Sequence, residues 1–162
     1  MRLELVHPMV VGFPISFLLV GLLLRLVAFF LRKNHLYKVV LIASWLTMSL
    51  GILSGIVAVF TGEVAHDIVH SKLCNHKILD YHERIAIVTL SIFAIALLLD
   101  RERKIHRFLG YAGVILYWIA PVFLVLTGYF GGKLVFEQGA AVENTCKGRT
   151  ENNTPHPASK KP

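Results

Sequence analysis

The sequence predicts an all-α membrane protein, a four-helix up-and-down transmembrane bundle with both termini on the outer, periplasmic side. Three observations lead to this fold class. The chain is 55% hydrophobic and only 17% charged, whereas soluble domains carry about 25% charged residues. Its apolar residues form four long runs, and the basic residues between those runs fall mostly in two connections. This composition excludes a disordered chain, a collagen-like fibre and a miniprotein built on disulfides.

The four apolar runs cover residues 8–31, 39–60, 85–99 and 108–130. A spanning helix needs about 20 predominantly apolar residues, and the third run alone is too short to cross the bilayer. We therefore expect the third helix to begin near Asp80. The sequence predicts a membrane domain of residues 1–139 with helices at about residues 7–31, 38–62, 80–100 and 107–136. No internal repeat is visible.

The orientation follows from the basic connections. Residues 32–38 contain three basic residues and no acid, and a second basic connection follows the third helix at residues 101–107. Cytoplasmic loops carry an excess of Lys and Arg, so both connections are expected inside and both termini outside. The net charge of +7 then reflects topology and requires no nucleic-acid partner. Residues 140–162 are polar and contain proline, so we expect a flexible tail.

Histidine is unusually frequent in this chain, which has eight histidines and only ten acidic residues. In the predicted topology five of them lie towards the outer face: His7, His66, His70, His76 and His82. Three acidic residues, Glu63, Asp67 and Glu137, lie at the same level and are possible proton acceptors or metal partners. Ionisable groups at membrane depth are costly and mark functional sites.

One interpretation of the histidines is a haem site. A b-type haem takes imidazole ligands on its two faces, so the ligands come from different helices across a bundle. His7 and His82 fit, because helices one and three lie on a diagonal, and His66 is the next candidate. His66 and His70 cannot form the axial pair, because residues four apart share one helix face. The sequence has no Cys-x-x-Cys-His motif for covalent haem.

A second interpretation is a non-haem metal site. His66 and His70 have the spacing that lets two imidazoles share one ion. Glu63 and His66 form one Glu-x-x-His element, although di-iron bundles need two. Together with His7, His82 and Glu137 they suggest a metal centre. A third interpretation is a structural subunit of a membrane complex, and the sequence leaves all three open.

Two further features lie outside the histidines. Cys74 and Cys146 both fall on the outer side of the predicted topology, where an oxidising compartment permits a disulfide between them. The glycines indicate packing: Gly51 and Gly55 form a small-residue stripe typical of closely packed helices. The pair Gly131-Gly132 is expected to end or bend the fourth helix.

The two ends of the membrane domain resemble a known family. His7-Pro8 followed by Phe13-Pro14 is similar to the opening of a bacterial four-helix membrane family, domain of unknown function 2231. Residues 127–139, with Gly131-Gly132 and a late Gly139, resemble its closing segment, and His82 also fits. Many members carry a His before Phe-Pro, where this chain has Gly12, so that position is not carried over.

The resemblance implies a place in the bacterial inner membrane and, because some members are fused to a Rieske domain, a role in electron transfer. We therefore expect a b-type cytochrome-like subunit that binds haem b near the outer face. It would be linked to quinol oxidation, with a quinone as a further cofactor. The expected partners are the lipid bilayer and other subunits of a redox complex, such as a Rieske protein or a cytochrome c. The chain is expected to act as a subunit of an oxidoreductase complex rather than as a stand-alone enzyme.

Overall fold

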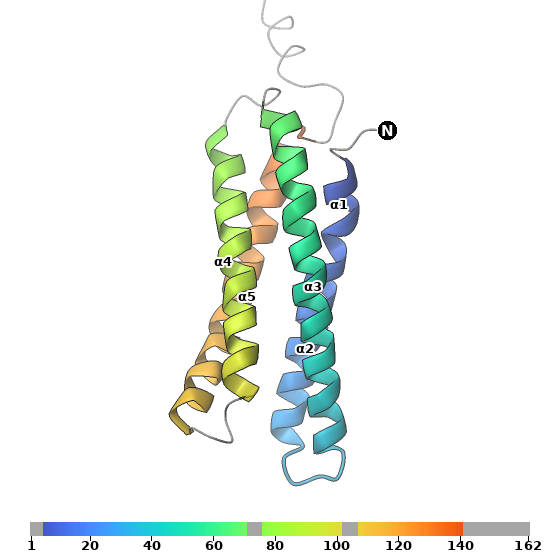
Figure 1. Ribbon diagram of the computed structural model, residues 1–162, viewed down its shortest axis with the longest axis vertical. Coiled ribbons are helices and arrows are strands. Elements are labelled where there is room, and N and C mark those ends of the chain that lie inside the picture. The colour runs from blue at the N-terminus through green and yellow to red at the C-terminus, as the bar shows by residue number, and fades with distance from the viewer. Residues whose placement is uncertain (1–4, 71–75, 102–106, 141–162) are drawn as a thin grey trace, which may run out of the picture.

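The computed structural model describes residues 5–70, 76–101 and 107–140, and the regular structure within these ranges is helical. The helices are α1 (Val6–Val10), α2 (Gly12–Phe30), α3 (Tyr37–His70), α4 (His76–Arg101) and α5 (Arg107–Phe136). α1 and α2 run in the same direction, and α3, α4 and α5 then alternate up and down the molecule. The start of α1 and the end of α5 therefore lie at the same end (Figure 1). Which side of a membrane this end faces stays a prediction.

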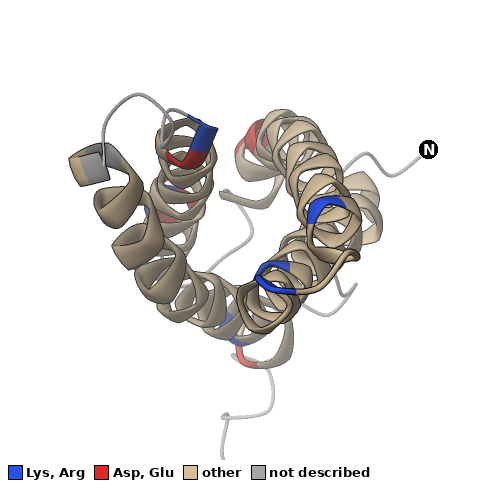
Figure 2. Ribbon diagram, turned by 90° about the horizontal axis from the view of Figure 1, so that it is seen from below, with Lys and Arg blue, Asp and Glu red and all other residues tan. Residues whose placement is uncertain are grey.

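In the described ranges, four segments are long and apolar enough to cross a membrane: Val6–Phe30, Tyr37–His70, His76–Arg101 and Gly110–Phe136. The predicted four-helix membrane fold is therefore confirmed. Seen along the bundle, most of the helical ribbon carries no charged residue (Figure 2). Large apolar side chains such as Leu23, Phe60 and Trp118 are exposed on the outside. Such surfaces suit helices whose neighbours are lipid tails.

The first membrane segment consists of two helices because of one proline. Pro14 has no N–H to donate to the carbonyl of Val10, and the helix is interrupted nearby, at Val11. The backbone of Val11 nevertheless stays helical, with φ −61° and ψ −23°, and its N–H donates to the carbonyl of His7 (3.0 Å). α1 and α2 therefore follow one course through the bundle.

The described chain forms two helical hairpins. The first hairpin comprises α1, α2 and α3 (residues 5–70), and the second comprises α4 and α5 (residues 76–140). Packing is extensive within each hairpin, whereas the hairpins meet mainly where α3 lies beside α4. Buried apolar residues of both hairpins meet in the middle of the bundle, where Leu18, Phe93, Ala120 and Leu124 form one cluster. This division matters for the site, which lies between the hairpins.

The two hairpins bury equivalent positions, although their residue identities show no repeat. Positions on α2 recur 75 positions later on α4: Pro14, Leu18 and Gly21 correspond to Thr89, Phe93 and Ala96, all buried. Positions on α3 recur 69 positions later on α5: Ser44, Met48, Gly51, Gly55 and Ala58 correspond to Gly113, Tyr117, Ala120, Leu124 and Thr127, again all buried. Each hairpin is thus built on the same packing register.

The helices differ from the predicted ranges at the end of the bundle where α1 begins. α3 continues to His70, eight residues beyond the predicted end at residue 62, and α4 begins at His76 rather than at residue 80. Residues 63–70 contain neither proline nor glycine, and Ala65 and Val69, four residues apart, are buried. Val69 packs with Leu134 of the second hairpin. The buried apolar face of α3 therefore continues beyond the end of the apolar run at residue 60.

The expected helix end at Gly131-Gly132 was wrong, because α5 passes through both glycines and continues to Phe136. α5 ends at Phe136, and Gly139, three residues later, has a φ of 66°. The N–H of Gly139 donates to the carbonyl of Val135 (3.2 Å), and that of Ala140 donates to Leu134 (3.0 Å). The bond from Gly139 has the 5→1 spacing of an αL cap, in which a left-handed residue follows the helix.

The expected close packing at Gly51 and Gly55 agrees with the structure. A Cβ at Gly51 would lie 2.8 Å from the Leu18 side chain, and one at Gly55 would lie 2.6 Å from Leu90. Gly51 thus brings α3 close to α2, and Gly55 makes room for a side chain of α4. Residues 1–4, 71–75 and 102–106 of the predicted membrane domain lie outside the described residues. So does the predicted tail of residues 140–162, apart from Ala140.

Candidate functional site

His7 is held by the second helix of its own hairpin. Its Nδ1–H donates to the backbone carbonyl of Ala58 on α3, 2.9 Å away. One turn further along α3, Gly62 leaves room for the ring, since a Cβ there would lie 3.2 Å from both Cε1 and Nδ1. The imidazole therefore rests directly against the α3 backbone.

His82 is held in the same way by the second hairpin. Its Nδ1–H donates to the carbonyl of Thr127 on α5, 3.1 Å away. Gly131 leaves room for this ring, since a Cβ there would lie 3.0 Å from its Cε1. The residues that hold the two rings are equivalent: the two histidines are 75 positions apart, and both the carbonyls and the glycines are 69 apart.

The two imidazoles meet between the hairpins. The centres of the His7 and His82 rings are 6.3 Å apart, and their planes are inclined at 77°. A neutral imidazole that donates through Nδ1 has an unprotonated Nε2, which acts as an acceptor or a metal ligand. A backbone carbonyl on the other nitrogen is the usual way in which proteins orient a ligating histidine. The pair therefore offers two oriented Nε2 atoms, one from each hairpin, that can act as acceptors or metal ligands.

Both rings line a cavity of about 410 Å³ between the hairpins. Its walls are mainly apolar and include Pro14, Leu18, Leu90 and Leu124. Its polar lining includes Glu63, His66 and Glu83. Cofactor and ligand sites have volumes of about 300–1,000 Å³ and combine apolar walls with a few placed polar groups. The cavity has both properties.

His66 has different neighbours from the other two candidate ligands. Its ring nitrogens lie 3.7 Å from Asp67, 3.8 Å from Asp80 and 3.9 Å from Glu83. Its ring centre is 5.3 Å from that of His70, which stacks on His76 at 4.0 Å. His66 thus belongs to a row of imidazoles flanked by carboxylates. It lines the cavity, but its nearest charged groups are acidic.

The other predicted partners do not come together with the histidine pair. Glu63 is exposed and touches the cavity, whereas the Asp67 side chain is 84% exposed. Glu137 pairs with Lys133 on its own helix (3.5 Å). In the described ranges, no three His, Cys, Asp or Glu side chains are placed to hold one metal ion. Cys74 and Cys146 lie outside the described residues.

The sequence analysis missed the groups that hold the two rings. The carbonyls of Ala58 and Thr127 carry no side-chain signal, so only the fold reveals them. Gly62 and Gly131 carry a weak signal, because glycine inside a helix is destabilising and often has a packing reason. Their role becomes clear only when each is seen against its histidine.

Comparison with known proteins identifies one family. The family model described as "Predicted membrane protein (DUF2231)" matches residues 4–144. No curated protein and no solved structure matches the chain. The match covers all four membrane segments, and it agrees with the resemblance seen at the ends of the membrane domain. The chain therefore belongs to the DUF2231 family of predicted membrane proteins.

Proposed function

We propose that this chain is a b-type haem-binding membrane subunit that transfers electrons, in which His7 and His82 would hold the haem iron. The observation that carries the proposal is the placement of these two rings. They come from opposite hairpins, face one cavity, and each has its Nδ1 fixed by a backbone carbonyl. A haem, when bound, supplies an iron centre that accepts and donates single electrons.

The ring separation fits one metal ion between the imidazoles. In a five-membered ring with bonds of about 1.33 Å, each nitrogen lies roughly 1.1 Å from the ring centre. Imidazole nitrogens bind metals at about 2.0–2.1 Å. Ligands on opposite sides of one ion therefore have ring centres roughly 6 to 6.5 Å apart. The observed distance is 6.3 Å.

The number of donors favours haem over a non-haem metal. The porphyrin provides four nitrogens, so the protein needs to supply only two ligands. A non-haem ion would take at least three ligands from the chain, and the described residues place no such group together. In the metal interpretation His66 acts together with His70. His66 lies beside Asp80 and Glu83, and the His70 ring contacts the rings of His66 and His76.

The wider role is electron transfer within a larger redox complex. The proposed site lies near the bundle end at which α1 begins and α5 ends, within reach of an external partner such as a Rieske protein or a cytochrome c. Quinol oxidation would supply two electrons, one for the haem and one for the external redox partner, and would release two protons. Glu63 and Glu83, which both line the cavity, are the groups that would accept these protons. These partners remain part of the proposal.

Optical and magnetic spectra of the purified chain test the proposal. After expression with ample haem, we expect a Soret band, haem b in the pyridine assay and a low-spin electron paramagnetic resonance (EPR) signal. His7→Ala and His82→Ala should each abolish the low-spin signal. His35→Ala, which changes an exposed histidine near the opposite end, is the matched control. Stoichiometric metal without haem would favour the metal interpretation. Protein with neither haem nor metal would favour a structural subunit.

A further inference from the structure

A buried ion pair joins the two hairpins at the end of the bundle opposite the histidine pair. The guanidinium of Arg25 on α2 donates to one carboxylate oxygen of Asp100 on α4. The Asp100 side chain is only 1% exposed and that of Arg25 is 14% exposed. The indole N–H of Trp45 on α3 donates to the second carboxylate oxygen, 2.8 Å away. Both oxygens of Asp100 are thus held by the first hairpin.

Arg25 also reaches the last helix. Its guanidinium carbon lies 5.5 Å from the centre of the Tyr117 ring on α5, within the range of a cation–π contact. The four long helices therefore contribute one residue each, two from either hairpin. We name Arg25, Trp45, Asp100 and Tyr117 the inner clamp.

The inner clamp and the histidine pair have the same spacing along the chain. Arg25 follows His7 by 18 residues, and Asp100 follows His82 by 18 residues. Eighteen residues make five turns at about 3.6 residues per turn, a length of about 27 Å. Arg25 therefore lies below His7 on the same side of its membrane segment, and Asp100 lies below His82 on α4. Joining Arg25 to Asp100 places the two histidines at the same depth.

We propose that Arg25 and Asp100 are positioning residues, which set the axial register of the two hairpins and thereby place His7 opposite His82. The apolar cluster between the clamp and the histidines, Leu18, Phe93, Ala120 and Leu124, is held by hydrophobic contacts, which are non-directional. A buried hydrogen-bonded ion pair, in contrast, is satisfied in one register only.

The charges also make the pairing specific. Arg25 and Asp100 occupy equivalent positions of the two hairpins but carry opposite signs. The clamp therefore forms between a first and a second hairpin, whereas two copies of the same hairpin would bring like charges together. An exchange of the two charges should favour the same register.

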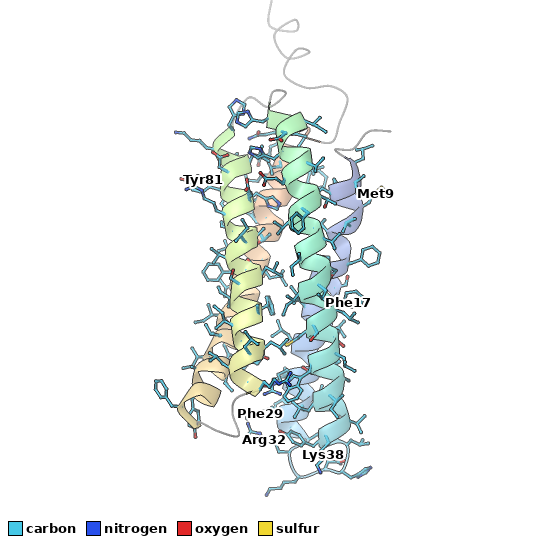
Figure 3. The ribbon with its side chains drawn as sticks, viewed as in Figure 1. Met9, Phe17, Phe29, Arg32, Lys38 and Tyr81 are labelled. Carbon is cyan, nitrogen blue, oxygen red and sulfur yellow. The ribbon has the colours of Figure 1, made fainter. Side chains whose placement is uncertain are left out.

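Spin labels near the histidines test the register without haem. Met9 and Tyr81 point outward on opposite sides of the bundle (Figure 3), and both are exposed. In full-length protein in nanodiscs, with Cys74→Ser and Cys146→Ser, labels at Met9→Cys and Tyr81→Cys should give one narrow distance distribution. Arg25→Gln and Asp100→Asn should broaden or shift it. Arg25→Asp combined with Asp100→Arg should restore it only in part, because Trp45 then lacks its carboxylate acceptor.

The control is Arg32→Gln, which removes an exposed positive charge from the same end of the first hairpin, and should leave the distribution unchanged. If the single variants fail to accumulate, Trp45→Phe replaces them, because it removes one donor and keeps the ion pair; it should broaden the distribution in part. A wild-type distribution in Asp100→Asn, or in Trp45→Phe where that variant replaces it, would overturn the proposal. A charge-exchanged protein whose distance distribution is no closer to wild type than that of the single variants would overturn it as well.

A second readout links the clamp to the proposed function, on which this part rests. Asp100→Asn should keep bound haem but lose much of its low-spin signal, because one imidazole no longer reaches the iron. The charge-exchanged protein should regain part of that signal. If the wild type binds no haem, the proposed function fails, while the spin-label distances still decide whether the inner clamp sets the register.

Discussion

The carbonyl oxygen of Thr127 lies 3.1 Å from Nδ1 of His82, one helical turn before Gly131, whose missing side chain leaves space for the same ring. Ala58 and Gly62 treat His7 in the same way. In each hairpin one turn of helix thus supplies both an acceptor for Nδ1 and a gap for the ring. This arrangement fixes the imidazole through the helix backbone, and at His7 the Thr61 hydroxyl also lies 3.4 Å from Nδ1.

Gly131→Ala and Gly62→Ala should therefore disturb the histidine pair. The new Cβ would lie 3.0 Å from Cε1 of His82, or 3.2 Å from the His7 ring, which is closer than most Cβ contacts. We expect each ring to tilt and the low-spin EPR signal of bound haem to shift or weaken. Gly12→Ala is the control, because nothing lies within 4 Å of its Cβ. Spectra identical to wild type in both variants would contradict this role for the glycines.

His66→Ala should leave haem bound with two axial imidazoles. The sequence left His7, His66 and His82 as candidates for the axial pair, but His66 lies within 4 Å of three carboxylates and contacts the His70 ring. The low-spin signal should persist in His66→Ala and disappear in His7→Ala. Loss of that signal in His66→Ala, with His82→Ala unaffected, would instead identify His66 as a ligand.

Gly51→Ala should destabilise the first hairpin. Its Cβ would lie 2.8 Å from the Leu18 side chain and 3.1 Å from the Leu18 backbone nitrogen. Because a backbone atom cannot turn aside, α2 and α3 would have to separate, and overpacking of this kind costs about 1–3 kcal/mol. Unfolding in mixed detergent measures the change. Gly12→Ala, with open space around it, should instead match or exceed wild-type stability; equal stability of the two variants would contradict the prediction.

The sequence predicted the four membrane helices well because each is marked by a long apolar run, a signal that needs no tertiary information. It also indicated His7 and His82 as a diagonal pair, since both precede such runs. It could not predict that α3 reaches His70, because that extension depends on Val69 packing with Leu134 of the other hairpin. The polar residues at 63, 66 and 67 interrupt the apolar run, so the sequence pattern did not indicate that this part of the helix has a buried face.

The inner clamp was missed for a related reason. Arg25 and Asp100 both lie near basic connections, so each appeared to be a cytoplasmic charge. Asp100, which is buried, lies 75 residues after Arg25 at the equivalent position of the second hairpin, and this equivalence appears in the packing rather than in residue identity. Only the three-dimensional register shows that the two charges meet.

Asp100→Ala should be among the most destabilising single changes in the chain. It leaves the Arg25 guanidinium without its buried partner and the Trp45 indole without its acceptor. Removing one member of a buried pair typically costs about 3–5 kcal/mol, whereas replacing both members by apolar residues is often neutral. The double variant Arg25→Met, Asp100→Leu should therefore need a higher fraction of denaturing detergent to unfold than Asp100→Ala. A double-mutant cycle in mixed detergent gives the coupling free energy, and additive losses would show that the two charges do not act together. Such a double variant also separates stability from register: it should recover much of the lost stability yet, lacking a directional contact, keep a broadened distance between the labels near His7 and His82.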